Sequence, residues 1–254
     1  MTGLSLSLSG RRAAVSGSSR GVGFAIAKAL ADAGADVAIN YLANDKRAQT
    51  ALDALKEINP SSISVKADVS TPEGAERLVS EAEEAFGGVD ILINNAHGRI
   101  IRNMFQRSGW EEHQTHIDSI LRPAFYLSRR VIDGMKSGNW GRIVNIGNNM
   151  LIQPVKGYSA LTSAMGGLLG FTRNLAAEAG PWGITVNMVS PGFVLTEEAP
   201  NTNESVRQAI CDSTPLGRLA MPEDAAGVVL FFCSEAGRFV TGANLSVDGG
   251  RIMG

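Results

Sequence analysis

The chain has 254 residues, a formal net charge of −2 and 44% hydrophobic residues. That apolar fraction is enough for a sizeable core and excludes a disordered chain. The small negative charge argues against nucleic acid as a partner, because binding to phosphates depends on an excess of cations. No apolar run is long enough to span a bilayer. The start of the chain lacks signal-peptide features, and the two cysteines have no scaffold spacing, so we expect a cytoplasmic protein.

Short apolar runs alternate with segments of helical period along the chain. The runs predict strands at residues 13–16, 36–40, 63–67, 91–94, 142–146, 185–189 and 245–247. Helices are predicted at residues 21–33, 46–58, 72–86, 111–136, 159–179 and 222–234. This alternation implies right-handed crossovers and a parallel sheet with helices on both faces. The sequence has no repeat or linker, so we predict one doubly wound, Rossmann-like α/β domain.

A glycine-rich turn joins the first predicted strand to the first predicted helix. Glycines allow a tight turn there and let the backbone approach a pyrophosphate, which the helix N-terminus attracts. We therefore predict a dinucleotide site, although a plain tight turn is the alternative. Its candidate binding residues are Gly17, Ser19, Arg20, Gly21, Val22 and Gly23.

The end of the second predicted strand bears on which nucleotide binds. An acidic residue there would hold the ribose 2′-hydroxyl of NAD, but this sequence has Asn40 followed by Tyr41. Arg20, Lys46 or Arg47 could face a 2′-phosphate instead, or could be ordinary solvated cations at helix starts. We predict NADP(H) as the cofactor.

Three motifs resemble those of the short-chain dehydrogenase/reductase (SDR) superfamily. They are the Gly-x-x-x-Gly-x-Gly turn from Gly17 to Gly23, Asn94-Asn95-Ala96, and Ser190-Pro191-Gly192. The resemblance covers about the whole chain. It implies that Asp68 and Val69 lie beside the adenine ring and that Thr196 lies near the nicotinamide carboxamide. The other cofactor-binding residues that it implies are Asn40, Asn94, Ala96 and Val194.

The usual catalytic positions of that family are altered in this sequence. Residues 141–171 align without gaps with the family's catalytic strand and its Tyr-x-x-x-Lys helix. Asn148 then takes the place of the Ser, Leu161 of the Tyr, Met165 of the Lys and Ile120 of the Asn. In the family, the Tyr supplies a proton while the Lys lowers its pKa and holds the ribose. Leu and Met can do neither, so we expect no ordinary alcohol–ketone interconversion.

A second register supplies a candidate phenol. Six residues separate Tyr158 from Met165, which is the Tyr-x6-Lys spacing of the enoyl-acyl carrier reductases, a branch of the superfamily. Tyr158 could hydrogen-bond a conjugated carbonyl while hydride adds to the far end of the C=C bond, or it could be a rim aromatic. Asn148 keeps an amide that could bind a substrate oxygen, or it could cap the strand end.

Several histidines and arginines remain to be placed. His97 replaces a family glycine near the expected nicotinamide, and we interpret it as a loop residue rather than a catalyst. His113 and His116 are expected to face solvent. Arg99 and Arg102 could meet an acidic substrate or lie in a solvated loop. The sequence has no metal-ligand spacing.

Three functions fit these observations. The first is an NADP(H)-dependent reductase of a polarised C=C or C=N bond in a small molecule, with Tyr158 and Asn148 orienting the substrate. The others are a non-redox enzyme such as a cyclase, dehydratase or isomerase, and a catalytically silent binding subunit. The resemblance implies a homodimer or homotetramer assembled through the long helix and the catalytic helix. Residues 193–215 are expected to form a mobile substrate lid.

Overall fold

The computed structural model describes residues 5–196 and 203–253. Within them, seven parallel strands form one sheet in the order β3-β2-β1-β4-β5-β6-β7. The strands are β1 Arg12–Val15, β2 Asp36–Tyr41, β3 Ile63–Lys66, β4 Ile91–Asn94, β5 Gly141–Ile146, β6 Ile184–Pro191 and β7 Asn244–Val247. The strand order reverses between β1 and β4, and in open α/β sheets ligands bind beyond the strand ends at such a point. The predicted fold class is confirmed.

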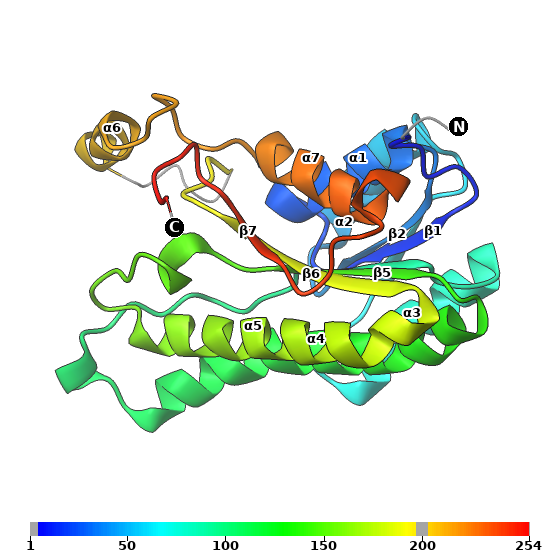
Figure 1. Ribbon diagram of the computed structural model, residues 1–254, viewed down its shortest axis with the longest axis horizontal. Coiled ribbons are helices and arrows are strands. Elements are labelled where there is room, and N and C mark those ends of the chain that lie inside the picture. Colours follow the sequence, from blue (N-terminus) through cyan, green and yellow to red (C-terminus); the bar gives the residue numbers. More distant parts are fainter. Residues whose placement is uncertain (1–4, 197–202, 254) are drawn as a thin grey trace.

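Two layers of helices enclose the sheet (Figure 1). The helices are α1 Gly21–Asp32, α2 Asp45–Lys56, α3 Pro72–Phe86, α4 Trp110–Ser137, α5 Ser159–Ala179, α6 Glu204–Asp212 and α7 Pro222–Cys233. Short 3-10 turns are η1 Phe105–Arg107, η2 Asn149–Leu151, η3 Gly180–Trp182 and η4 Glu235–Gly237. None of the described helices combines the length and the apolar character needed to cross a membrane.

Local sequence sets the ends of these helices. At the start of α3, the Thr71 hydroxyl accepts a hydrogen bond from the Gly74 amide at 3.1 Å, and Pro72 fills the first helical position. Both features satisfy or remove amides that a helix start leaves unpaired. Gly87 ends the same helix with a φ of +83°, which glycine adopts at little cost.

An apolar core lies on each face of the sheet. Successive strand residues point to opposite faces, so Leu92 enters one core while Ile91 and Ile93 enter the other. Both faces are covered, and the strands are therefore apolar at nearly every position. The core with Ile91 and Ile93 packs against α1, α2 and α7, and the core with Leu92 packs against α3, α4 and α5.

The segment predicted as a lid contains a helix that the sequence did not indicate. Helix α6, Glu204–Asp212, lies within it and stands beyond one end of the sheet (Figure 1). None of the α6 side chains is buried. Val206, Ala209 and Ile210 do recur at helical spacing, and the sequence analysis did not use this short pattern. Residues 197–202 of the segment, including Glu197 and Glu198, lie outside the described residues.

Candidate active site

The glycine turn between β1 and α1 has a geometry that larger residues cannot adopt. Gly17 and Gly21 have φ values of +60° and +55°. A Cβ on Gly17 would lie 2.9 Å from the Ala96 Cα, and one on Gly23 would collide with the Asn95 amide group and the Gly17 carbonyl. The turn is therefore packed directly against the segment that leaves β4.

Hydrogen bonds fix the turn to the end of β4. The Ser16 hydroxyl donates to the Ile93 carbonyl at 3.2 Å and accepts from the Asn95 and Ala96 amides, each at 3.0 Å. The Asn95 side chain donates to the Ser16 and Gly17 carbonyls at 3.1 and 2.9 Å. Asn95 thus braces the predicted nucleotide site, a role that the sequence analysis did not assign to it.

Asn40 acts on the same turn from the other side. Its side chain is buried, and its Oδ1 accepts from the Gly17 amide at 3.1 Å. Its Nδ2 donates to the Ala67 and Val65 carbonyls at 3.0 and 3.2 Å. Both Nδ2 hydrogens and one Oδ1 lone pair are used by protein partners, so Asn40 holds the turn to β3.

The nearest acid after β2 is also committed to protein partners. The Lys66 ammonium donates to the Asp45 carboxylate at 2.9 Å, and the Tyr41 hydroxyl donates to it at 3.0 Å. These hydrogen bonds, with that of Lys66 first, hold the pKa of Asp45 below its usual value. Lys46 beside it is exposed, while Arg47 is half-buried. A phosphate at this end of β2 would meet cations and no uncommitted carboxylate from α2's first turn.

The chain leaving β6 folds back over the glycine turn. A Cβ on Gly21 would lie 3.6 Å from the Thr196 Cγ2, so Thr196 borders the start of α1. Val194 forms a parallel bridge with Ala220, which holds this return path in place. On the adenine side expected from the sequence, Asp68 is exposed and accepts a hydrogen bond from the Ser70 hydroxyl, whereas Val69 is buried.

A buried polar network lies beneath the site. Asn94 donates to the Asn145 side chain at 2.8 Å and to the Ser128 hydroxyl at 3.3 Å. Asn145 in turn donates to the Thr172 hydroxyl at 2.8 Å. Asn94 therefore ties β4 and β5 to α4 and α5. The sequence could have indicated this network, because Asn145 interrupts the apolar run that begins at Ile143 and buried polar groups need hydrogen-bond partners.

The three residues that the sequence alignment predicts at the family's Asn, Tyr and Lys positions lie in one apolar cluster. Ile120, Leu161 and Met165 are only 5%, 2% and 5% exposed. The other buried members of this cluster are Ala124, Ala164, Leu168 and Met188. None of these side chains carries an ionisable group or a hydroxyl. The cluster can exclude water, but it cannot donate or relay a proton.

Tyr158 borders this apolar cluster at the start of α5. It is half-buried, and its ring packs against the cluster. Among residues 5–196 and 203–253, nothing forms a hydrogen bond with its hydroxyl, which leaves the phenol available to a ligand. The Arg102 guanidinium carbon lies 5.5 Å from the centroid of its ring.

Asn148 has one half of its amide engaged. Its Oδ1 accepts from the Met150 amide at 3.1 Å and caps η2, which is the structural role weighed for it from the sequence. Its Nδ2 has no hydrogen-bond partner in the described part of the chain. The side chain can therefore cap the turn and still donate one hydrogen bond to a substrate oxygen.

The histidines differ from expectation in one case. His97 is exposed and its Nδ1 lies 2.9 Å from the Gly98 carbonyl, as a loop residue would. The prediction that His116 faces solvent is wrong, since it is 2% exposed. Its Nδ1 lies 2.9 Å from the Glu112 carbonyl, and its Nε2 accepts from the Ile101 amide at 3.2 Å. The segment after β4 covers the start of α4 and buries this ring.

Residues 17–251 match the family model described as enoyl-(acyl carrier protein) reductase. The chain belongs to the short-chain dehydrogenase/reductase superfamily. A relative, the 3-oxoacyl-(acyl-carrier-protein) reductase FabG of Vibrio cholerae, is 36% identical over 248 residues, which are 98% of this chain and 100% of that protein. The family assignment agrees with the sheet order and with the position of the glycine turn.

Solved structures give the same result. A mutant of the Serratia marcescens short-chain dehydrogenase/reductase has a TM-score of 0.88 and 32% identity, covering 96% of this chain and 98% of its own. The L-sorbose reductase of Gluconobacter frateurii, complexed with NADPH and L-sorbose, has a TM-score of 0.90 and 30% identity. It covers 97% of this chain and 98% of its own. The relatives are oxidoreductases of one fold, which supports an enzymatic ancestry for this chain.

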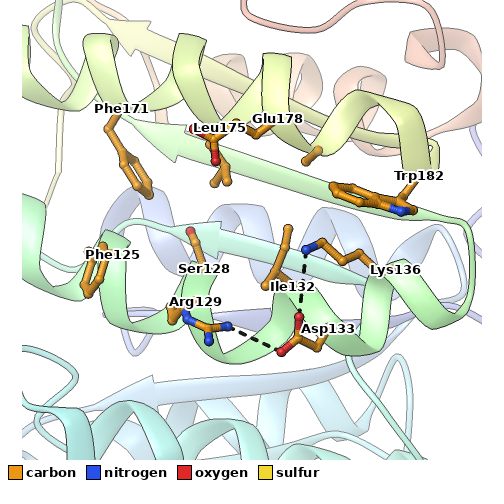
Figure 2. Close-up of a pocket in the computed structure, with 11 residues that line it drawn as sticks. Phe125, Ser128, Arg129, Ile132, Asp133, Lys136, Phe171, Leu175, Glu178 and Trp182 are labelled. Carbon is orange, nitrogen blue, oxygen red and sulfur yellow. Dashed lines mark hydrogen bonds and ion pairs between the residues drawn. The ribbon is translucent and has the colours of Figure 1, made fainter.

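A separate groove runs between α4 and α5, away from the glycine turn (Figure 2). Its volume is about 610 Å³. Figure 2 shows Phe125, Ile132, Phe171, Leu175 and Trp182 along it, with Arg129, Asp133 and Lys136 linked by ion pairs at one side. The Lys136 ammonium also lies 4.1 Å from the Trp182 ring centroid. The groove is thus an apolar surface with charges along one edge.

Proposed function

We propose that the chain is an NADP(H)-dependent reductase that acts on a polarised C=C or C=N bond of a small molecule. The observation that carries the proposal is the braced glycine turn, whose close packing at Gly17 and Gly23 leaves no room for a side chain at either position. The NADPH in the L-sorbose reductase complex supports the choice of nucleotide. The commitment of Asp45 to Lys66 supports it as well, because a free acid would repel a 2′-phosphate.

The polarised bond follows from what the catalytic positions lack. The apolar cluster at Ile120, Leu161 and Met165 has no group that could protonate a ketone oxygen. A conjugated carbonyl needs less help, since its oxygen can share the developing charge. Tyr158 would donate a hydrogen bond to that oxygen, and the free Nδ2 of Asn148 would donate a second. Reduced nicotinamide, when bound, would supply hydride to the far carbon of the polarised bond, and water would supply the proton that completes the reduction.

The test is oxidation of NADPH by the purified protein with a panel of enones and imines, followed as loss of reduced-cofactor absorbance. Tyr158→Phe should abolish turnover and leave NADPH affinity unchanged, because only the donated hydrogen bond is lost. Tyr126→Phe is the matched control, since that ring packs against the core on α4. Tight NADPH binding without turnover on any substrate, or full activity in Tyr158→Phe, would contradict the proposal. Product of unchanged oxidation state formed without nucleotide would favour the non-redox alternative.

A catalytically silent nucleotide-binding subunit is the second candidate, and the apolar cluster favours it. It predicts activity only after a second SDR chain with intact catalytic residues is added. Both candidates share the proposal of a homodimer or homotetramer, which the groove between α4 and α5 supports. Both also share a cytoplasmic location, which the free thiols of Cys211 and Cys233 suit.

Assembly can be tested at the groove. Phe125→Glu should lower the molar mass measured by light scattering, because a charge on the groove wall opposes burial against another subunit. Phe125 is 51% exposed, so the change should leave the subunit folded. Phe105→Glu places the same charge at a side chain that does not line the groove, and it should leave the mass unchanged.

A further inference from the structure

The segment between β4 and α4 forms a wall beside Tyr158. The Asn103 amide donates to the Gly157 carbonyl at 2.9 Å, directly before Tyr158. The Asn103 side chain donates to the Glu112 carboxylate at 2.9 Å, and the Ile101 amide donates to His116 at 3.2 Å. Three hydrogen bonds thus fix the backbone on both sides of Arg102.

These anchors determine where the Arg102 side chain lies. A Cβ on Gly157 would be 3.1 Å from the Arg102 Cγ and 3.4 Å from its Nε, so the arginine stem lies against that glycine. Gly157 has a φ of +88°, a conformation that other residues rarely adopt. The stem is therefore packed beside the backbone, and the guanidinium is directed over the face of the Tyr158 ring.

The charge of Arg102 is not neutralised by the described protein. No carboxylate in residues 5–196 or 203–253 forms an ion pair with it, and Glu112, the acid beside the segment, is taken by Asn103. An aromatic face attracts a cation but leaves its N–H groups free. The guanidinium thus keeps the planar donors that bind a carboxylate or a phosphate in two places at once.

We propose that Arg102 selects substrates that carry an anionic group, a carboxylate or a phosphate, on the same small molecule as the bond that is reduced. This inference rests on the proposed function, because it places the reacting carbonyl at Tyr158. Arg99 on the same exposed segment adds positive charge. Ile152 and Val155, which precede Tyr158 and are about half exposed, offer an apolar surface for the substrate body. The substrate class is then a small unsaturated carbonyl compound with an acidic substituent.

The experiment compares matched ligands on the NADPH-saturated protein. The probes are 4-carboxybenzylideneacetone, its methyl ester and the corresponding aryl phosphate, with the saturated ketone of each for binding without turnover. The acid should bind about ten-fold more tightly than the ester, as expected for a charged hydrogen-bonded pair. A preference for the phosphate over the carboxylate would identify the anion.

Variants assign the preference to one residue. Arg102→Gln should remove it by raising KM for the acid with little change in kcat, and Arg102→Lys should restore part of it. Arg107→Gln, on the same segment and distant from any contact with Tyr158 in the described structure, is the control and should keep the preference. Equal binding of acid and ester by the wild type, or equal losses in Arg102→Gln and Arg107→Gln, would overturn the proposal. Arg102-dependent binding of the saturated acid without any turnover would sustain the anion site and refute only the reductase.

Discussion

The glycine turn and the apolar cluster are made in opposite ways. Around the turn, the side chains of Ser16, Asn40 and Asn95 form hydrogen bonds with backbone groups and hold the turn in place. In the cluster, Leu161 and Met165 bring only hydrocarbon and sulfur to positions where the alignment leads us to expect the family's phenol and ammonium. The turn therefore fits the dinucleotide site that we propose, and the buried side chains of the cluster carry no group that could transfer a proton.

The difference shows that binding and chemistry are separable in this fold. A nucleotide site built from backbone tolerates no added side-chain atoms but depends little on charge. A proton-transfer site depends on the identity of two or three side chains, whose replacement by apolar residues of similar size costs the core nothing. The fold can therefore persist unchanged while its reaction is lost or altered.

The largest effect is expected when a lysine is placed in the apolar cluster at residue 165, the position that the alignment assigns to the family's lysine. Met165→Lys should lower the free energy of unfolding by about 3–5 kcal/mol near neutral pH, because an unpaired charge would be buried. Burial lowers the folded-state pKa of the introduced amine below its unfolded value of about 10.4. The loss should be complete below the folded pKa and should disappear as pH rises towards the unfolded one. Denaturant melts across this range provide the measurement.

Met165→Leu is the matched control, and it should cost less than about 1.5 kcal/mol. A stable Met165→Lys protein that binds NADPH more tightly would contradict the distinction between a polar glycine turn and a separate apolar cluster. It would mean that the nucleotide ribose reaches the cluster and that the two regions form one polar site.

The turn can be tested by adding a single methyl group. Gly23→Ala should lower stability by about 1–3 kcal/mol and sharply weaken NADPH binding, because the new Cβ collides with the Asn95 amide and the Gly17 carbonyl. Calorimetric titration with NADPH measures the second effect. In Gly227→Ala, on the exposed side of α7, the new Cβ meets no atom within 4 Å. The Gly227→Ala control should be stabilised by about 0.5–1 kcal/mol through helix propensity. If Gly23→Ala left the affinity for NADPH unchanged, the assignment of the turn as a nucleotide site would be refuted.

The smallest effect is expected at the wall that carries Arg102. His116→Ala removes the acceptor for the Ile101 amide and should cost about 1 kcal/mol. Faster hydrogen exchange at Ile101 and Asn103 would show that the wall has loosened, and the acid preference should fall with it. His113→Ala is the control, because His113 is only half-buried, stacks on Trp110 and does not contact the Ile101 amide. Unchanged exchange in His116→Ala would show that the wall does not depend on this ring.

Much of the architecture could be predicted from the chain alone. Helices Pro72–Phe86 and Ser159–Ala179 and strand Ile91–Asn94 were predicted with the bounds that the structure has, and the other strands and core helices differ by a few residues at their ends. These elements have strong apolar periods and clear terminators. Helix α6 was missed because its apolar pattern is short, and His116 was misplaced because the segment that covers it has no regular structure.

The nucleotide and catalytic assignments remain predictions, and the structure adds the contacts that decide how to test them. The sequence by itself determined the order of strands and helices and the place of the glycine turn, because each depends on local pattern or spacing. Only the tertiary structure decided that Ile120, Leu161 and Met165 share one buried cluster and that Arg102 lies over Tyr158. It also decided that the Asn40 side chain forms hydrogen bonds with the backbone of Gly17, Val65 and Ala67. Those relations join residues far apart in the chain, and they arise from packing that no short stretch of sequence encodes.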